Sequence, residues 1–301
     1  MTRGFRLPEE TDLPGIFERL AIAREDREEV LAAWPAREGD SVIWRSLANA
    51  YDTLVRDMGG FAPIELPAPA VDSTPIGRYF FVYVYLAALA EVRRFHAGRG
   101  VPDEISWRTL SDLGRNLERD RLLFGVRGLR TSGWLTLHFR GAIYELGRLQ
   151  YNRMTVRAAH VADAFREGEP AIGIHIPESG ALTAEACDDS IGRAGPFFAR
   201  HFPETPTRLG LCTSWLLDPQ LAEYLAPESN IVRFGRRFTL VGEGYDGDAD
   251  VLRFVFHRIA PSIDDLPQRT TLERAIVAHL RSGKHWRTRT GWLELGLPKI
   301  P

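Results

Sequence analysis

Cysteine and lysine are both scarce in this chain of 301 residues. Its two cysteines, Cys187 and Cys212, are too few for a disulfide framework and lack the spacing of a metal site. Lysine occurs only at Lys284 and Lys299, so arginine supplies nearly all of the positive charge. Sparse, unpatterned cysteine favours a reducing environment, and we expect a cytoplasmic protein.

A long apolar stretch and a strong net charge are missing as well. The longest apolar run, residues 79–90, spans about twelve residues, whereas a membrane-spanning helix needs about twenty. Residues 1–12 contain no apolar core of the kind that marks a secretory signal. The formal net charge is −2, while nucleic acids and anionic membranes attract basic surfaces. The sequence therefore predicts neither a membrane nor a nucleic-acid partner.

Several catalytic signatures do not occur. The spacings His-x-x-x-His, His-x-Glu and paired cysteine are missing, so the sequence predicts no metal site. There is no dinucleotide fingerprint, no P-loop and no Gly-x-Ser-x-Gly elbow. A hydrolase triad can be drawn from Ser214 or Cys212 with His175 and Asp218, but triads are defined by geometry.

What is present is the composition of a globular protein, with 44% apolar and 26% charged residues. Apolar residues recur at helical spacing over residues 13–34, 41–58 and 76–96, which predicts a helical N-terminal half. The pattern changes at residue 132. Apolar and polar residues then alternate over 134–139, Arg140-Gly141 offers a turn, and 142–151 continues as a second strand, so we expect a β-hairpin.

The C-terminal half mixes strand and helix patterns. In residues 171–176 three isoleucines alternate with Gly173 and His175, as in a half-buried strand that Pro177 ends. Thr183 is placed to cap a helix over 184–200. The sequence also predicts a strand over 209–215, a strand over 250–259, a helix over 272–281 and an aromatic segment over 286–295.

Four segments carry a resemblance to a known family. They are HFRGAIYELGRLQYNRM (138–154), HIPESGALTAEACDDS (175–190), CTSWLLDPQL (212–221) and SNIVRFGRRF (229–238). They resemble the bacterial GNAT-like N-acyltransferases, which join an N-acyltransferase N-terminal domain to a GNAT-like C-terminal domain. The resemblance implies an α+β fold, with a helical domain over 1–153 that ends in the hairpin and a mixed β-sheet flanked by helices over 154–301. Because the hairpin should join that sheet, a boundary near Met154 cuts a continuous unit.

The resemblance implies an enzyme that moves an acyl group from acyl-coenzyme A, as co-substrate, to an amine of a small molecule or peptide. Contacts with the donor are expected from two strand ends, the loop after the first, and a helix start: Ile176, Gly180, Ala181, Leu182, Thr183, Ser214, Trp215 and Asn230. Ordinary members of the superfamily carry Arg/Gln-x-x-Gly-x-Gly/Ala in this loop, with its amides on the pyrophosphate.

This loop has only Gly180, followed by Glu185, Asp188 and Asp189. Helix N-termini favour anions, and acidic side chains there compete with a pyrophosphate. The alternative function is therefore a noncatalytic GNAT-like binding module that has lost coenzyme A.

Acyl transfer to an amine needs a group that takes a proton. His175 is the first candidate for this general base, because it lies at the C-terminal end of its strand and titrates near neutrality. Glu178 in the following loop and Glu145 in the hairpin are the others. The structural alternatives are a histidine bonded to a backbone carbonyl, a solvated Glu178 and a surface-facing Glu145.

Two donor-site candidates and the catalytic candidate Asp218 also have ordinary structural readings. Trp215 is equally a core tryptophan. Asp218 precedes Pro219 and is placed to cap the helix that follows. Asn230, or Ser229 before it, is a helix cap in the same way.

Overall fold

The computed structural model describes residues 4–35, 42–68, 74–130, 132–157 and 165–296. The chain divides into two compact units, 1–144 and 145–301. This division precedes the expected boundary between Arg153 and Met154. A cut at Met154 would split strand β2 (Gln150–Thr155), which pairs along its length with β3 (Pro170–His175).

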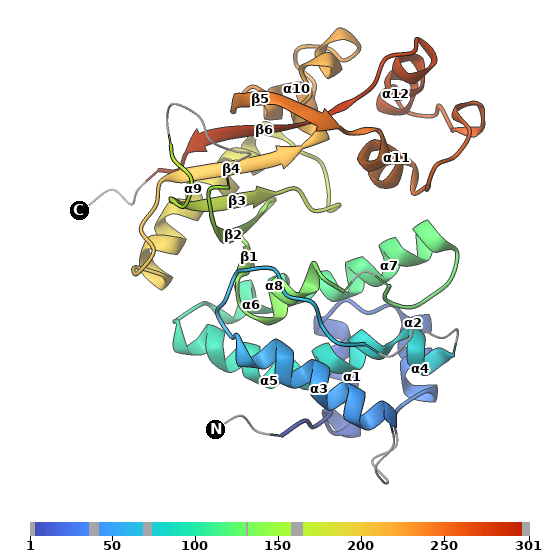
Figure 1. The fold of residues 1–301 in the computed structure, drawn as a ribbon, viewed down its shortest axis with the longest axis vertical. Helices are drawn as coiled ribbons and strands as arrows, with labels where there is room; N and C mark the ends of the chain where they lie inside the picture. Colours follow the sequence, from blue (N-terminus) through green and yellow to red (C-terminus); the bar gives the residue numbers. More distant parts are fainter. Residues whose placement is uncertain (1–3, 36–41, 69–73, 131, 158–164, 297–301) are drawn as a thin grey trace. The chain divides into compact units, whose positions relative to one another are not determined.

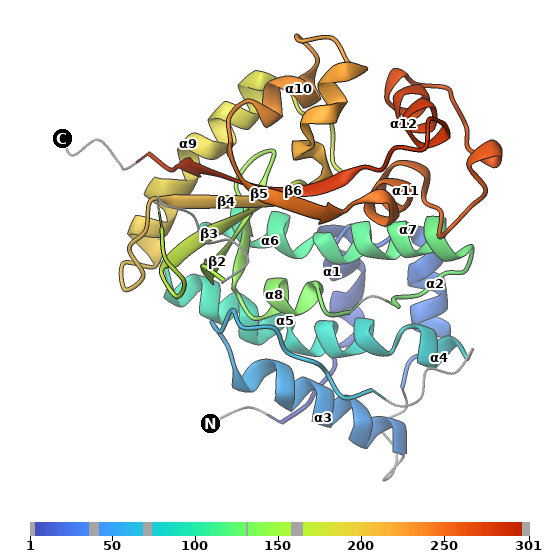
Figure 2. The ribbon, with the colours of Figure 1, turned by 45° about the horizontal axis from the view of Figure 1, so that its top comes forward.

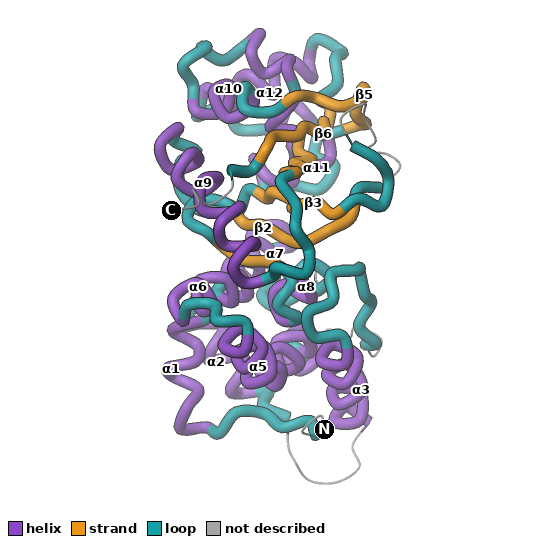
Figure 3. Tube along the Cα trace, turned by 90° about the vertical axis from the view of Figure 1, so that its left-hand side faces the viewer, coloured by secondary structure: helices purple, strands orange, loops and turns teal. Residues whose placement is uncertain are grey.

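The first unit is helical, as predicted (Figures 1 and 3). After a short 3-10 turn at Glu10–Asp12, its helices are α1 (Leu13–Arg19), α2 (Arg24–Ala32), α3 (Val42–Arg56), α4 (Pro75–Arg78), α5 (Phe80–Gly98), α6 (Asp103–Leu110), α7 (Asp112–Phe124) and α8 (Leu135–Phe139). The predicted range 13–34 contains α1 and α2, 41–58 contains α3, and 76–96 contains the end of α4 and most of α5; Ser41 lies outside the described residues.

Helix α5 forms the core of this unit. Residues 80–89 are all buried, so its aromatic and β-branched residues, which favour strands, pack on every side of a helix instead. Two tyrosine hydroxyls from this helix are satisfied within the unit. Tyr83 donates to Val30 O and Ala33 O at 2.9 Å each, and Tyr85 donates to Ser132 O at 2.7 Å.

The predicted strand over 134–139 is wrong. Residues 135–139 form helix α8, in which Leu135, Thr136, His138 and Phe139 are all buried. Alternation reports a strand only when one face is exposed, and a helix buried on most sides removes that contrast. The hairpin is formed instead by β1 (Ile143–Glu145) and β2, with the turn at residues 146–149.

The second unit is built on a six-stranded mixed sheet in the order β1-β2-β3-β4-β6-β5 (Figure 1). Its further strands are β4 (Leu209–Ser214), β5 (Thr239–Asp246) and β6 (Arg287–Glu294). β3 and β4 are parallel, whereas the pairs β2–β3, β4–β6 and β5–β6 are antiparallel. This arrangement confirms the expected α+β class and the mixed sheet.

Helices flank this sheet (Figure 2). They are α9 (Ala184–His201), α10 (Asn230–Gly235), α11 (Asp248–Phe256) and α12 (Thr271–Arg281), with 3-10 turns at Trp215–Leu217, Pro219–Glu223 and Ile263–Asp265. Thr183 Oγ1 accepts from Ala186 N at 3.3 Å and caps α9 as predicted. Among the described residues, no helix combines the length and the apolar character needed to cross a bilayer.

Two C-terminal expectations need correction. Residues 248–256 form helix α11, so the predicted strand over 250–259 is wrong. Asp248 and Asp250 lie in its first turn, where acidic side chains stabilise a helix, and this signal outweighs the local alternation. The aromatic segment over 286–295 contains β6, a central strand held between β4 and β5.

The β2–β3 pairing predicts how fragments behave. Residues 154–301 lack most of β2 and leave one edge of β3 unpaired, so we expect this fragment to aggregate. Residues 145–301 keep β2 and should elute as a compact species and melt cooperatively. Size-exclusion chromatography and thermal melts compare the two. Equal solubility and cooperative melting of 154–301 would contradict the structural role of β2.

Candidate active site

The two faces of β3 have different surroundings. In the antiparallel register Gln150 lies opposite His175 and Asn152 lies opposite Gly173, so these four residues share one face of the sheet. The isoleucines of β3 point to the other face, together with Tyr151. The Tyr151 hydroxyl lies 3.0 Å from Ser190 Oγ of α9, which places α9 on the isoleucine face (Figure 2).

His175 is tied to a neighbouring asparagine. Its Nε2 lies 2.6 Å from Asn152 Oδ1, and Asn152 Nδ2 donates to Arg153 O at 2.9 Å. Because only the amide nitrogen donates to a carbonyl, the second bond turns Oδ1 toward the histidine. Oδ1 only accepts, so His175 Nε2 carries a proton. In a neutral ring this contact selects the tautomer that is protonated on Nε2.

Gly173 makes the room for this pair. A Cβ at this position would lie 2.2 Å from Asn152 Oδ1 and 3.1 Å from Met154 Sδ. The first distance is shorter than real Cβ contacts and the second is tight, so the Asn152 side chain would have to move beneath any larger residue. The strand pattern predicted the glycine and the histidine on one face but gave no sign of their asparagine partner.

The parallel ladder between β3 and β4 is short. Its register comprises Ile172 opposite Gly210 and Gly173 opposite Leu211, so the strand ends at His175 and Ser214 lie beyond it. On its other side β3 stays paired with β2 as far as His175. The pairing of β3 with β4 therefore stops before the C-terminal ends of the two strands.

Of the three residues expected to contact the donor at and beyond the end of β4, one binds backbone, one packs in a core and one begins a helix. Ser214 Oγ accepts from Leu216 N at 3.1 Å. Trp215 is 6% exposed and packs with a cluster that includes Trp286, as a core tryptophan does. Asn230 is the first residue of α10, and Ser229 caps that helix through Val232 N.

The loop between β3 and α9 keeps some features of an anion site. Gly180 has φ +71°, a left-handed conformation that suits glycine, and the exposed Ala181 and the N-cap residue Thr183 follow it. Two of the three acidic residues of α9 form ion pairs. Asp188 lies 2.7 Å from Arg237 Nε, and Asp189 lies 2.8 Å from Arg193 Nη2. These arginines offset negative charge that would otherwise oppose a phosphate.

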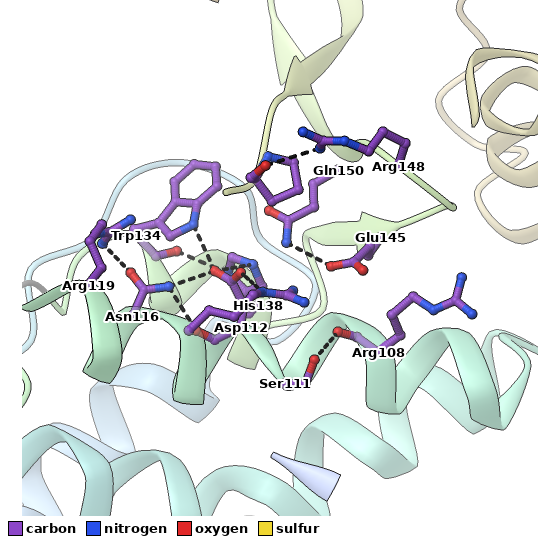
Figure 4. Close-up of polar contacts among 12 residues, drawn as sticks. Arg108, Ser111, Asp112, Asn116, Arg119, Trp134, His138, Glu145, Arg148 and Gln150 are labelled. Atoms are coloured by element: carbon purple, nitrogen blue, oxygen red, sulfur yellow. Dashed lines mark hydrogen bonds and ion pairs between the residues drawn. The ribbon is translucent and has the colours of Figure 1, made fainter. Parts of the chain in front are cut away.

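The two glutamates predicted as alternative bases differ in surroundings. Glu178 is exposed in the loop. Glu145 is buried at 5% exposure, and Gln150 Nε2 donates to its Oε2 at 3.2 Å (Figure 4). The surface-facing reading of Glu145 is therefore wrong: the carboxylate is buried and hydrogen-bonded, as a polar group in an apolar strand must be.

The groups drawn as a hydrolase triad are not arranged as one. Burial raises the pKa of Cys212 to about 12, which keeps its thiol protonated and unreactive. Asp218 is a structural cap: its carboxylate accepts from Gln220 N at 3.0 Å and from Arg287 N at 2.7 Å. These contacts confirm the capping interpretation of Asp218.

Two polar clusters were not anticipated from the sequence. In the first unit, buried Asp112 Oδ2 accepts from Asn116 Nδ2 at 2.8 Å and from Trp134 Nε1 at 3.1 Å, and lies 3.2 Å from His138 Nε2 (Figure 4). This network joins α7 to α8. In the second unit, Asp246, Asp248 and His285 bring ligand atoms within 4.8 Å of one another, with His285 Nδ1 2.7 Å from Asp248 Oδ2.

A short parallel ladder, a loop leading into a capped helix, and a tethered histidine at the strand end define the class of protein as GNAT-like. The profile of the N-acyltransferase N-terminal domain matches residues 11–141, and that of the GNAT-like C-terminal domain matches residues 143–293. The chain belongs to the N-acyltransferase family that combines these two domains. No match was found among curated proteins.

Solved structures of acyltransferases share the fold of the whole chain. One, in complex with decanoyl-CoA and teicoplanin, is 41% identical, covers 97% of this chain and 90% of its own, and has a TM-score of 0.89. A mutant acyltransferase in complex with octanoyl-CoA gives the same values. A complex with decanoyl-CoA is 43% identical with a TM-score of 0.87, covering 97% of this chain and 90% of its own.

Substitution of Gly173 tests the geometry around His175. Gly173→Ala should displace Asn152, release the His175 ring and lower the free energy of unfolding by about 1–3 kcal/mol, the usual cost of overpacking. Gly192→Ala is the control, because Gly192 lies in α9 with nothing near its Cβ position and should stabilise by about 0.5–1 kcal/mol. Denaturant unfolding and ¹⁵N NMR of the histidine rings measure both effects. Unchanged stability and an unchanged tautomer in Gly173→Ala would refute the assignment.

Proposed function

We propose that this protein transfers an acyl group from acyl-coenzyme A to an amine. The observation that carries the proposal is the contact of His175 Nε2 with Asn152 Oδ1 at the end of β3, where the ladder to β4 has already stopped. The relatives of known structure form complexes with decanoyl-CoA and octanoyl-CoA. These complexes support acyl-coenzyme A as the donor and an acyl chain of similar length. The two buried free cysteines suit a cytoplasmic location.

In the proposed reaction the amine nitrogen attacks the thioester carbonyl carbon. A carbon–nitrogen bond forms, the carbon–sulfur bond breaks, and coenzyme A leaves as a thiolate that takes up a proton. His175 Nδ1 receives the proton that the amine loses, and Asn152 Oδ1 stabilises the resulting imidazolium through Nε2–H. The donor's pyrophosphate lies on the backbone from Ile176 to Thr183, and its arm passes Ser214 and Asn230.

The acceptor belongs to the same proposal. One relative forms complexes with teicoplanin and with 10C-teicoplanin, the second together with CoA. We therefore place the acceptor among amines of glycopeptides of this kind. A panel of amines, with decanoyl-CoA as donor and product mass as the readout, tests the assignment. Acylation of simple amines but not of a glycopeptide would restrict the proposal to small molecules.

Removal of the base should separate chemistry from binding. His175→Ala should lower kcat by roughly a hundredfold or more, the usual scale of general-base loss, and leave the Kd of acyl-coenzyme A nearly unchanged. The wild-type rate should rise with pH as the imidazole loses its proton, and this limb should vanish in the variant. Steady-state kinetics across pH and calorimetric titration provide both readouts. Full activity with the same pH limb would make Glu145 or Glu178 the next base to test.

Coenzyme A binding separates the enzyme from the noncatalytic module. Tight binding with pyrophosphate density along residues 175–183 supports the enzyme. Density against Arg287 and Arg289 instead would reject this placement, and no binding at millimolar coenzyme A would favour the module.

A further inference from the structure

The turn between β1 and β2 lies against the loop that precedes α9. Arg148, in this turn, donates to three carbonyl oxygens of that loop: Nη1 to Pro177 O at 3.0 Å, Nη2 to Gly180 O at 3.1 Å and Nε to Ala181 O at 3.2 Å. Figure 4 shows the extended Arg148 side chain and one of these bonds. The Arg148 guanidinium therefore binds three of the carbonyl oxygens of residues 177–181.

The turn itself is firmly held. Leu146 N donates to Leu149 O at 3.0 Å, and Gly147 has φ +89°, which only glycine adopts without strain. Buried Ser190 of α9 accepts from Leu149 N at 3.0 Å and donates to Leu146 O at 2.6 Å. The backbone of the turn that carries Arg148 is therefore anchored to α9, the helix that follows the loop bound by Arg148.

The carbonyl contacts determine where the loop amides point. In a planar trans peptide, the C=O of one residue and the N–H of the next point in opposite directions. With the carbonyls of Gly180 and Ala181 on Arg148, the N–H groups of Ala181 and Leu182 point away from the guanidinium. Among the hydrogen bonds of the described residues, none has either amide as its donor. A pair of outward amides at a helix start is a site for an anion.

We propose that Arg148 is the positioning residue of the pyrophosphate loop, and this inference rests on the proposed use of acyl-coenzyme A. Arg148 performs the role that the glycine pattern has in ordinary members of the superfamily. It binds the loop carbonyls, and the N–H groups of Ala181 and Leu182 then point in the opposite direction, toward the pyrophosphate. Burial lowers the pKa of Arg148, and the three carbonyls compensate its partly desolvated charge.

The test compares donors with and without a pyrophosphate. Arg148→Met should raise the KM of decanoyl-CoA and the Kd of coenzyme A on the order of tenfold to a hundredfold, because the loop loses its preorganisation. The kcat at saturating donor should stay within about twofold, because no transition-state contact is lost. Turnover of S-decanoyl-pantetheine, which lacks the pyrophosphate, should not change.

Two further variants make the test specific. Arg148→Lys keeps the charge but cannot span three carbonyls, so it should restore only part of the affinity; it also serves as the second variant if Arg148→Met fails to fold. Arg208→Met is the control, because Arg208 makes an exposed pair with Glu294 at 3.5 Å and should match the wild type.

The outcomes distinguish the inference from the proposed function. Equal losses with decanoyl-CoA and S-decanoyl-pantetheine would show a general structural role and overturn the inference. Unchanged coenzyme A affinity in both Arg148 variants would also overturn it while leaving the proposed function intact. A wild-type protein that binds no coenzyme A would overturn the proposed function and the inference together.

Discussion

The antiparallel pairing of β2 with β3 is the constraint on which the rest of the second unit depends. It places Asn152 opposite Gly173 and two residue pairs from His175, so the ring and its partner meet on the same face. The turn that leads into β2 also carries Arg148 to the loop after β3. A register shift of one residue would turn these side chains to the opposite face and dismantle both arrangements.

In the proposed pyrophosphate site, the loop before α9 would present its backbone amides to an anion without the usual glycines. Glycine allows close approach and unusual φ values, but what binds an anion is the direction of the N–H groups. A guanidinium that binds the carbonyl oxygens also fixes the N–H groups, because in each peptide the C=O and the N–H point in opposite directions. Arg237 and Arg193 pair with Asp188 and Asp189 of α9 and offset part of the negative charge that would oppose an anion.

The errors in the strand predictions have one physical origin. Period-two alternation at 134–139 and 250–259 lies in helices α8 and α11. α8 is too short and too buried to show a helical stripe, and α11 exposes Phe254 while burying Val251, so hydrophobicity does not track burial. Conversely, β6 lies between two strands distant in sequence, and no local pattern reports such pairing.

The sequence by itself determined the helical first half, the α+β class, strand β3 with His175 on its polar face, the capped helix α9 and the family. These features rest on local periodicity, caps and motif letters, all of which are properties of neighbouring residues. Only the tertiary structure decided that Asn152 sets the histidine tautomer, that Arg148 holds the loop, and that Asp246, Asp248 and His285 converge. Asn152 and His175 lie 23 positions apart, and Asp246 and His285 lie 39 positions apart. Folding brings such distant residues together, so their spacing along the sequence does not predict these contacts.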